Sequence, residues 1–362
     1  MSEHIFQQTQ PEWLTPYDAG VCEACDWVFL APSGKLTRTC PHCFQEQITP
    51  ITPSSQALAN LHPPELIIPF TITEGTLADG LRNFSSGIPF APDDLNPQSL
   101  RSRSRSIFLP VWLVDCSVIA NWKAEMGYNY EVISHQDSYD DHSSRWQSRQ
   151  VKETRVRWEP RIGRLSRTYQ NVPAPAMEEA RRLEAALGQF PMSQAKQFDA
   201  APSGAFIRLP NRTTEDAWTE AVAALQNLAM GECCQAASAD YIRQYEWQPS
   251  FPSANWTLLL EPVLSTYYLD DDNHPQIVLI HGLTGKVSGM RRSSMKKATR
   301  TATILFVIAA ILFVLSLLMG LISVPFPPLA PVTIISLVVA LGLATGGGGC
   351  LLTAWQFNRK PR

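Results

Sequence analysis

The chain has 362 residues, with 33 acidic and 30 basic side chains that are unevenly distributed. Residues 301–362 contain three basic residues and no acidic residue, so residues 1–300 have a formal net charge of −6. A domain that binds duplex nucleic acid usually has a positive field that replaces the phosphate counterions. The composition therefore argues against nucleic-acid binding by the soluble part as a whole.

The first residues predict a cytosolic start. Residues 1–20 lack the basic end and the apolar core of a secretory signal, and we expect residues 1–19 to form a flexible tail. In the cytosol thiols stay reduced, so cysteines there are available to bind metal.

Four cysteines form the most specific motif of the chain. Cys22, Cys25, Cys40 and Cys43 give two C-x2-C pairs separated by fourteen residues. Two such pairs can form a closed tetrahedral site for one structural Zn²⁺, with iron as the minor alternative. We expect a small β zinc ribbon over residues 20–48, with a strand at 27–29, a turn at 31–34 and a return strand at 36–39.

A Pro- and Ser-rich stretch, residues 49–64, predicts a linker to a cytoplasmic α+β domain with an antiparallel sheet over residues 65–295. The patterns predict helices at 73–84, 177–190 and 213–230, strands at 107–123, 128–132, 151–158, 256–266, 276–280 and 286–289, and loops at 85–106 and 134–149. Thr213, with Asp216 three residues on, is expected to cap the third helix. Similar apolar stretches at 109–113 and 260–264 suggest two related β-rich halves, with a helical insertion at 175–250.

A basic segment of this domain is the candidate binding face. Its members are Arg145, Arg149, Lys152, Arg155, Arg157, Arg161, Arg164 and Arg167. The aromatic residues Trp146, Trp158 and Tyr169 are interleaved with them, as stacking platforms for nucleic acid would be. An ordinary exposed sheet face is the alternative interpretation.

No motif predicts an enzyme. The segment His281–Lys286 resembles a phosphate loop but lacks its first glycine and its Ser or Thr, so a glycine-rich hairpin turn is expected. Residues 270–272, three successive aspartates, are expected to form a polar turn. The cluster of His135, Asp137, Asp140, Asp141 and His142 is interpreted as a polar loop rather than a metal site.

Two uncharged runs, residues 301–324 and 329–355, predict a transmembrane hairpin over residues 300–357, followed by a basic tail at 358–362. Basic residues flank both runs: Arg291, Arg292, Lys296, Lys297 and Arg300 before the first, and Arg359, Lys360 and Arg362 after the second. The positive-inside rule then places both termini in the cytoplasm. The four glycines at 346–349 predict either close helix approach or a flexible break.

Several segments together resemble a group of bacterial membrane-anchored zinc-ribbon proteins. They are Cys40–Cys43, Ile67–Phe70, Phe108–Leu113, Arg164–Pro173 and Gly282–Gly289. Such proteins are often labelled as replication-restart helicase relatives, but this sequence has no Walker A loop. The resemblance implies location in the bacterial plasma (inner) membrane and, as in some members, association with phage-shock-type envelope-stress systems.

The expected function is that of a membrane-tethered zinc-ribbon adaptor in envelope stress or membrane organisation. It would contact membrane lipid and present a cytoplasmic surface to a cytosolic protein partner. The alternative is a membrane-linked nucleic-acid-binding protein that uses the zinc ribbon and the face at 145–167.

Overall fold

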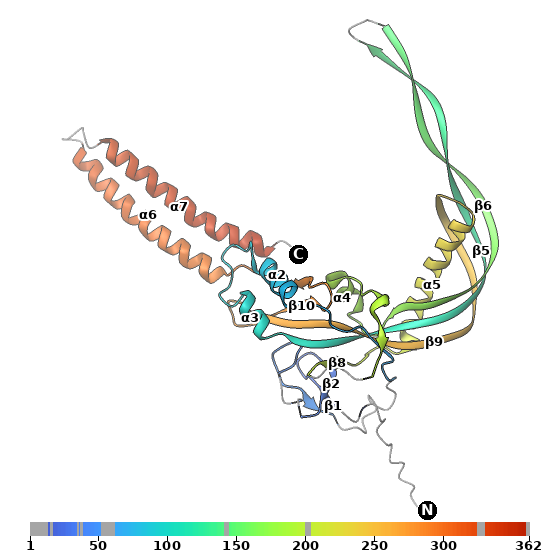
Figure 1. Cartoon of the computed structure of the whole chain (residues 1–362). Helices are drawn as coiled ribbons and strands as arrows, with labels where there is room; N and C mark the ends of the chain where they lie inside the picture. Colours follow the sequence, from blue (N-terminus) through green and yellow to red (C-terminus); the bar gives the residue numbers. More distant parts are fainter. Residues whose placement is uncertain are drawn as a thin grey trace, which may run out of the picture.

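The computed structural model describes residues 14, 17–34, 36, 39–51, 62–140, 145–199, 204–323 and 330–359. These residues form one large mixed sheet, helices packed on it, and two long helices that project from the body (Figure 1). The strands are β1 (Tyr17–Val21), β2 (Val28–Pro32), β3 (Thr49–Pro50), β4 (Leu66–Ile67), β5 (Arg105–Asp140), β6 (Arg145–Pro175), β7 (Lys196–Gln197), β8 (Phe206–Arg208), β9 (Tyr241–Leu269), β10 (Pro275–His281) and β11 (Val287–Gly289). The helices are α2 (Glu74–Ser85), α3 (Pro97–Ser102), α4 (Ala180–Leu187), the short 3-10 helix η2 (Met192–Gln194), α5 (Thr214–Ala236), α6 (Met295–Ser323) and α7 (Ala330–Arg359).

The sheet is mixed rather than purely antiparallel, which corrects the prediction. Its main path runs β11-β10-β9-β5-β8-β2-β1-β3, and β6 pairs with β5 beside this path. Most neighbours are antiparallel, but β4 pairs with β9 and β8 pairs with β5 in parallel. The parallel pairs arise because β4 and β8 are short strands that return from distant parts of the chain to the centre of the sheet.

Strands β5 and β6 are far longer than the sequence predicts. Their pairing continues without a break from Cys116↔Tyr169 to Asp140↔Arg145, so the loop expected at 134–149 is wrong. Its polar residues belong to a hairpin whose distal half has no buried face, and therefore no apolar alternation. Register shifts near residues 115, 118 and 124 bend the strands, and Figure 1 shows the resulting arc.

Helix α5 packs along the curved sheet and builds the core of the arc (Figure 1). Thr213 caps it, and a reciprocal contact with Asp216 completes the predicted capping box. The helix continues to Ala236, six residues beyond the prediction. Its buried stripe consists of the small or medium residues Ala217, Ala221, Leu225, Ala229 and Cys233, which let the helix lie close to the strands.

The segment that contains the four clustered cysteines is continuous with the large sheet. β2 pairs with β1 on one side and with β8 on the other. Of the return strand expected at 36–39, Leu36 lies in a turn, Thr39 forms a single bridge with Gln47, and residues 37 and 38 lie outside the described residues. Of the linker expected at 49–64, the first two residues form β3, and residues 52–61 lie outside the described residues.

Other predicted elements are confirmed with shifted bounds. The helix expected at 73–84 is α2, capped by Thr73, and the helix expected at 177–190 is the shorter α4. The loop expected at 85–106 contains α3. The glycine-rich turn before Val287 joins β10 to β11 as predicted, and the expected insertion at 175–250 ends with the first ten residues of β9.

Helices α6 and α7 are long and apolar enough to cross a membrane, with mean hydropathies of 3.0 and 2.0 over their candidate spans. They pack side by side, and Ser316 donates a hydrogen bond to Ser336 across the pair (2.7 Å). α7 is unbroken through the four glycines. A Cβ on Gly347 would lie 3.2 Å from the ring of Phe306, so this glycine permits close approach of the helices.

Candidate metal centre and binding surfaces

The structure brings all four predicted metal ligands together. The Sγ atoms of Cys22 and Cys43 lie 3.5 Å apart, those of Cys25 and Cys40 lie 3.8 Å apart, and all four lie within 4.8 Å of one another. A tetrahedral zinc with bonds of about 2.3 Å requires sulfur–sulfur separations of about 3.8 Å. The donor set therefore fits a closed S4 metal site.

Two knuckles of the same backbone geometry hold the sulfurs. The carbonyl of Cys22 accepts from the amide of Asp26 (2.8 Å), and the carbonyl of Cys40 accepts from that of Phe44 (3.1 Å). Asp26 and Phe44, each directly after the second cysteine of its pair, both have a φ of 56°. This left-handed residue closes each turn and leaves the two thiols of the knuckle pointing to one side.

Within the cysteine cluster the Cys40 thiol has a lowered pKa, whereas burial raises the pKa of Cys22 to about 11 and the hydrogen bond with Cys40 raises that of Cys25. A hydrogen bond from the Cys25 thiol and the nearby amides of Cys43 and His42 lower the pKa of Cys40 to about 5. The thiolate is the form that binds metal, so Cys40 is the natural first ligand. Because four sulfurs fill a tetrahedral shell, the site has the composition of a structural rather than a catalytic centre.

A buried arginine, which sequence reasoning missed, lies beside this cluster. Arg208 on β8 is 2% exposed, and its guanidinium lies 4.9 Å from the centroid of the Trp27 ring. It donates to the carbonyl oxygens of Leu209 (2.7 Å) and Val28 (3.3 Å). Burial lowers its pKa to about 10, and the negative charge of Glu179, followed by Cys25 and Cys40, opposes that shift. Four thiolates around one Zn²⁺ have a net charge of −2, which a neighbouring guanidinium partly neutralises.

His42 is a packing residue rather than the exposed knuckle residue that the sequence predicts. Its ring stacks on Trp27 with 3.6 Å between centroids, and burial lowers its pKa to about 4. The imidazole is therefore neutral at physiological pH.

The candidate basic face lies on β6. Most of its basic side chains form ion pairs with nearby carboxylates. The ion pairs are Lys152–Glu131 (3.3 Å), Arg155–Glu153 (3.0 Å), Arg157–Glu159 (2.9 Å), Arg161–Glu159 (2.9 Å) and Arg167–Glu232 (3.2 Å). Arg145 and Arg149 also lie on β6, and Arg164 is exposed. Pairing of this kind leaves a mixed surface rather than a continuous positive field.

The distal part of the β5–β6 hairpin stands apart from the rest of the sheet. β9 pairs with β5 only as far as Gly127↔Tyr241, whereas β5 and β6 continue together to Asp140↔Arg145. We call residues 128–140 and 145–157 the distal ribbon. At about 3.3 Å per residue it extends roughly 40 Å from the three-stranded region, and Figure 1 shows it projecting from the body. It contains four acidic and five basic residues.

The distal ribbon exposes large apolar side chains. Trp146 is 72% exposed and Ile133 is 58% exposed. No strand of the described chain pairs with the outer edge of either of its strands, so rows of backbone groups are open on both sides. Open edges with exposed aromatic residues are typical of surfaces that add a strand from a partner.

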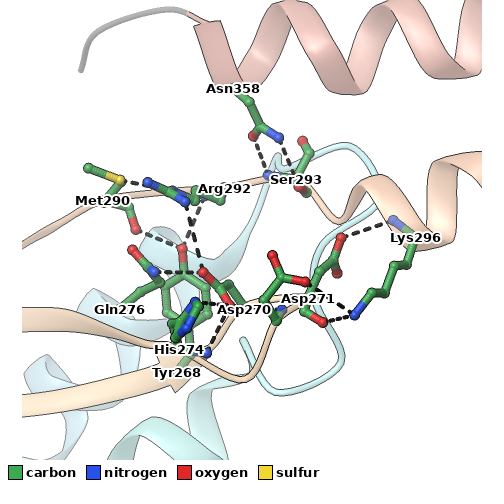
Figure 2. Close-up of polar contacts among 11 residues, drawn as sticks. Tyr268, Asp270, Asp271, His274, Gln276, Met290, Arg292, Ser293, Lys296 and Asn358 are labelled. Atoms are coloured by element: carbon green, nitrogen blue, oxygen red, sulfur yellow. Dashed lines mark hydrogen bonds and ion pairs between the residues drawn. The ribbon is translucent and has the colours of Figure 1, made fainter. Parts of the chain in front are cut away.

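The membrane-flanking residues bind the folded body instead of projecting freely. Figure 2 shows Arg292 at Asp270 (3.8 Å) and Lys296 at the turn of Asp271 and Asp272. Lys297 pairs with Asp93 (2.5 Å), Arg291 donates to Ser86, Arg300 is exposed, and Arg359 lies over the ring of Trp355 (5.0 Å). Lys360 and Arg362 lie outside the described residues.

The beginning of α6 and the end of α7 are held together by hydrogen bonds next to the folded body. The Asn358 side chain, near the end of α7, accepts from the amide of Ser293 (2.7 Å) and donates to its carbonyl (3.0 Å) just before α6 (Figure 2). The Asp271 carboxylate accepts from the amide of Lys296 in the first turn of α6 (2.9 Å). The beginning of α6 and the end of α7 therefore lie on the same side of the apolar segment.

The aspartate turn is a polar turn, as predicted. The carboxylate of Asp270 accepts from the amides of Asp272 (3.0 Å) and His274 (2.9 Å) and from the Gln276 side chain (2.8 Å). Burial acts to raise the pKa of Asp270, but these hydrogen bonds outweigh it and lower the pKa below its usual range. The oxygens that could hold a cation are thus already engaged.

The cluster expected around His135 lies at the distal ribbon. His135 and Asp137 are on β5, while Asp141 and His142 lie outside the described residues. Comparisons with protein-family models, with curated proteins and with solved structures found no match for this chain.

Proposed function

We propose that this chain is a membrane-tethered zinc-ribbon adaptor that presents the distal ribbon to a cytosolic protein partner. The observation that carries the proposal is the combination of a projecting two-stranded ribbon and an apolar helical pair on one rigid sheet. An isolated two-stranded hairpin is at best marginally stable in water, so a third strand from a partner would stabilise it. Open edges, Trp146 and Ile133 supply the backbone and side-chain contacts.

The helical pair anchors the adaptor, with both termini on the cytoplasmic side of a bacterial plasma membrane. The contacts of Asn358 with Ser293 support this arrangement, because they hold the two helix ends on one side. The basic residues there and the uncharged connection between the helices fit the positive-inside rule. A role in envelope stress or membrane organisation rests on the sequence resemblance alone.

Zinc serves as a structural ion in this proposal. When bound, it would cross-link the two knuckles through Cys22, Cys25, Cys40 and Cys43 and so fix β1 and β2 against β8. We expect metal analysis of the purified chain to find one zinc per chain, and none in Cys40→Ser/Cys43→Ser. Iron or an empty site in the purified protein would refute the assignment.

The nucleic-acid alternative is the weaker one. Five basic residues of the predicted face pair with neighbouring carboxylates, and the distal ribbon as a whole has five basic against four acidic residues, an excess of a single positive charge. Salt-dependent binding requires unpaired cations that replace counterions.

Crosslinking from intact membranes tests the adaptor. The decisive variant replaces residues 131–154 with an Asn-Gly turn, which shortens the hairpin and retains the Tyr130↔Arg155 pair. We expect the wild type to capture a specific protein that the shortened chain and Trp146→Ser lose, and that the matched exposed variant Ile162→Ser, outside the distal ribbon, retains. Equal capture by the shortened chain would refute the ribbon as the binding surface, and salt-dependent capture of nucleic acid would favour the alternative.

A further inference from the structure

A second candidate site lies far from the distal ribbon, in a cavity of about 470 Å³. Its floor is one face of the sheet, formed by Leu109, Val111 and Leu113 of β5 with Leu259 of β9. Its walls come from α4, the segment after it, and the middle of α5. This volume lies in the range of small-molecule sites, and a mostly apolar lining is typical of them.

One carboxylate interrupts the apolar floor. Glu261 pairs in register with Leu109 across the β5–β9 ladder, so it occupies a position where the neighbouring side chains are leucine and valine. It is half-buried, and within the described part of the chain no hydrogen bond or ion pair engages its oxygens. An ionised carboxylate removed from water without a partner costs several kcal/mol on the usual scales, so the ionised form of Glu261 requires a cationic partner.

The charges around Glu261 indicate the sign of the missing partner. The cavity is also lined by Glu184 on α4 and Glu220 on α5, and among the described residues Arg181 is the one basic side chain of its lining. Arg181 is 81% exposed and lies 3.9 Å from Glu220, which also has a bidentate contact with Arg212. Burial, together with the negative charge of Glu184, raises the pKa of Glu261 to about 8. The part of the cavity lined by Glu261 therefore favours a cation and disfavours an anion.

We propose that this cavity binds a small amphipathic amine, with its ammonium group at Glu261 and its apolar body against the leucines of the sheet. Phe190 and Met192, which line the cavity after α4, and Met177 before it supply adaptable apolar contacts. An ammonium can donate to the carboxylate oxygens while the rest of the molecule excludes water, which strengthens the charge-assisted hydrogen bond. This site does not depend on the adaptor function.

Binding has a defined proton balance. At neutral pH the free Glu261 is protonated because burial raises its pKa to about 8. An ammonium that binds there forms an ion pair with the carboxylate, and the carboxyl proton leaves to the buffer. We expect close to one proton to be released for each amine bound near neutral pH.

The test uses the full-length chain in lipid nanodiscs and three probes of one shape: phenylbutylamine, phenylbutanol and phenylbutyrate. We expect isothermal titration to show binding of the amine at least about tenfold tighter than the alcohol, with the carboxylate weakest. Titrations in buffers of different ionisation enthalpy measure the released proton. Glu261→Gln should lose both the preference for the amine and the proton release. It should still bind phenylbutanol, and that binding shows that the cavity is still folded.

The matched control is Glu184→Gln, which alters another carboxylate of the lining without removing the group on the floor. It should retain most of the preference for the amine. The proposal is overturned if no probe binds the wild type, if amine and alcohol bind equally, if the carboxylate binds best, or if Glu261→Gln leaves the preference unchanged.

Discussion

Replacement of Arg208 by methionine tests whether the cysteine cluster holds a doubly negative metal centre. The guanidinium is 2% exposed, donates to the carbonyls of Leu209 and Val28, and lies over Trp27 next to the cysteines. Methionine approximates its length and removes its charge. If zinc is bound by four thiolates, the substitution removes a charge that compensates the centre.

The magnitude follows from the hydrogen bonds and the charge. The carbonyl of Val28 keeps the amide of Leu209 as a partner (3.0 Å), whereas the carbonyl of Leu209 loses the bond from Arg208. A buried carbonyl that loses its donor costs about 1–3 kcal/mol. In the metal-free protein, removing a buried cation also removes part of the free-energy cost of its desolvation. In the metal-bound protein, the same change leaves the negative charge of the zinc centre less neutralised. We therefore expect zinc affinity to fall by roughly tenfold to a hundredfold, about 1.4–2.8 kcal/mol.

Competition with a chromophoric chelator measures this affinity, and thermal unfolding with and without chelator measures the coupling to stability. Arg208→Lys is the control, because it keeps the charge and loses the forked donor. We expect it to retain most of the zinc affinity. A methionine variant that binds zinc within twofold of the wild type, or that loses equal stability with and without metal, would refute the electrostatic reasoning.

Three further outcomes are expected. Replacing residues 131–154 with Asn-Gly should change the free energy of unfolding by less than about 1 kcal/mol, because the distal ribbon buries little apolar surface. Thermal unfolding measures this change. Loss of the cooperative unfolding transition would contradict the prediction. Burial raises the pKa of Glu261 above its unfolded value, so the contribution of this group to stability is lost as pH rises from about 4.5 to about 8, by up to about 1.4 kcal/mol per pH unit. Glu261→Gln should flatten this part of the pH profile of the melting temperature. An unchanged profile would disprove the assignment. Asn358→Ala should lower the free energy of local opening at the beginning of α6 by about 1–2 kcal/mol, since the backbone amide and carbonyl of Ser293 both lose a partner. Hydrogen exchange of α6 should be faster in this variant than in the exposed control Gln356→Ala. Equal exchange in the two variants would argue against this contact.

Local signals were sufficient where a few adjacent residues determine the structure. Thr213 and Asp216 predict the start of α5, and the capping box is present. The cysteine spacing predicts the S4 cluster, because a knuckle forms within four residues and each pair brings its own turn. The apolar runs likewise predict two long helices, since helix hydrogen bonds close within each segment.

Other features required distant segments to meet. Strands were predicted at 128–132 and 151–158, but the part of the distal ribbon within residues 134–149 was interpreted as a loop, because its side chains lack a buried face and so a period-two pattern. Arg208 lies 165 residues or more from the four cysteines, and nothing in its neighbours Ile207 and Leu209 indicates a charge beside a metal centre. The candidate basic face was identified from its arginines, but the local carboxylates that pair with them became evident only from the cross-strand register.

The sequence by itself determined the parts of this protein whose interactions are local: the metal-binding knuckles, the capped helices and the apolar helical pair. Only the tertiary structure decided which charges are compensated and which are not. Glu261 and Glu153 are both strand glutamates, yet one lies without a described partner in an apolar cavity and the other lies 3.0 Å from Arg155. The energy of a charge depends on its solvent exposure and on its nearest opposite charge, and both are set by residues that the chain brings together from far apart.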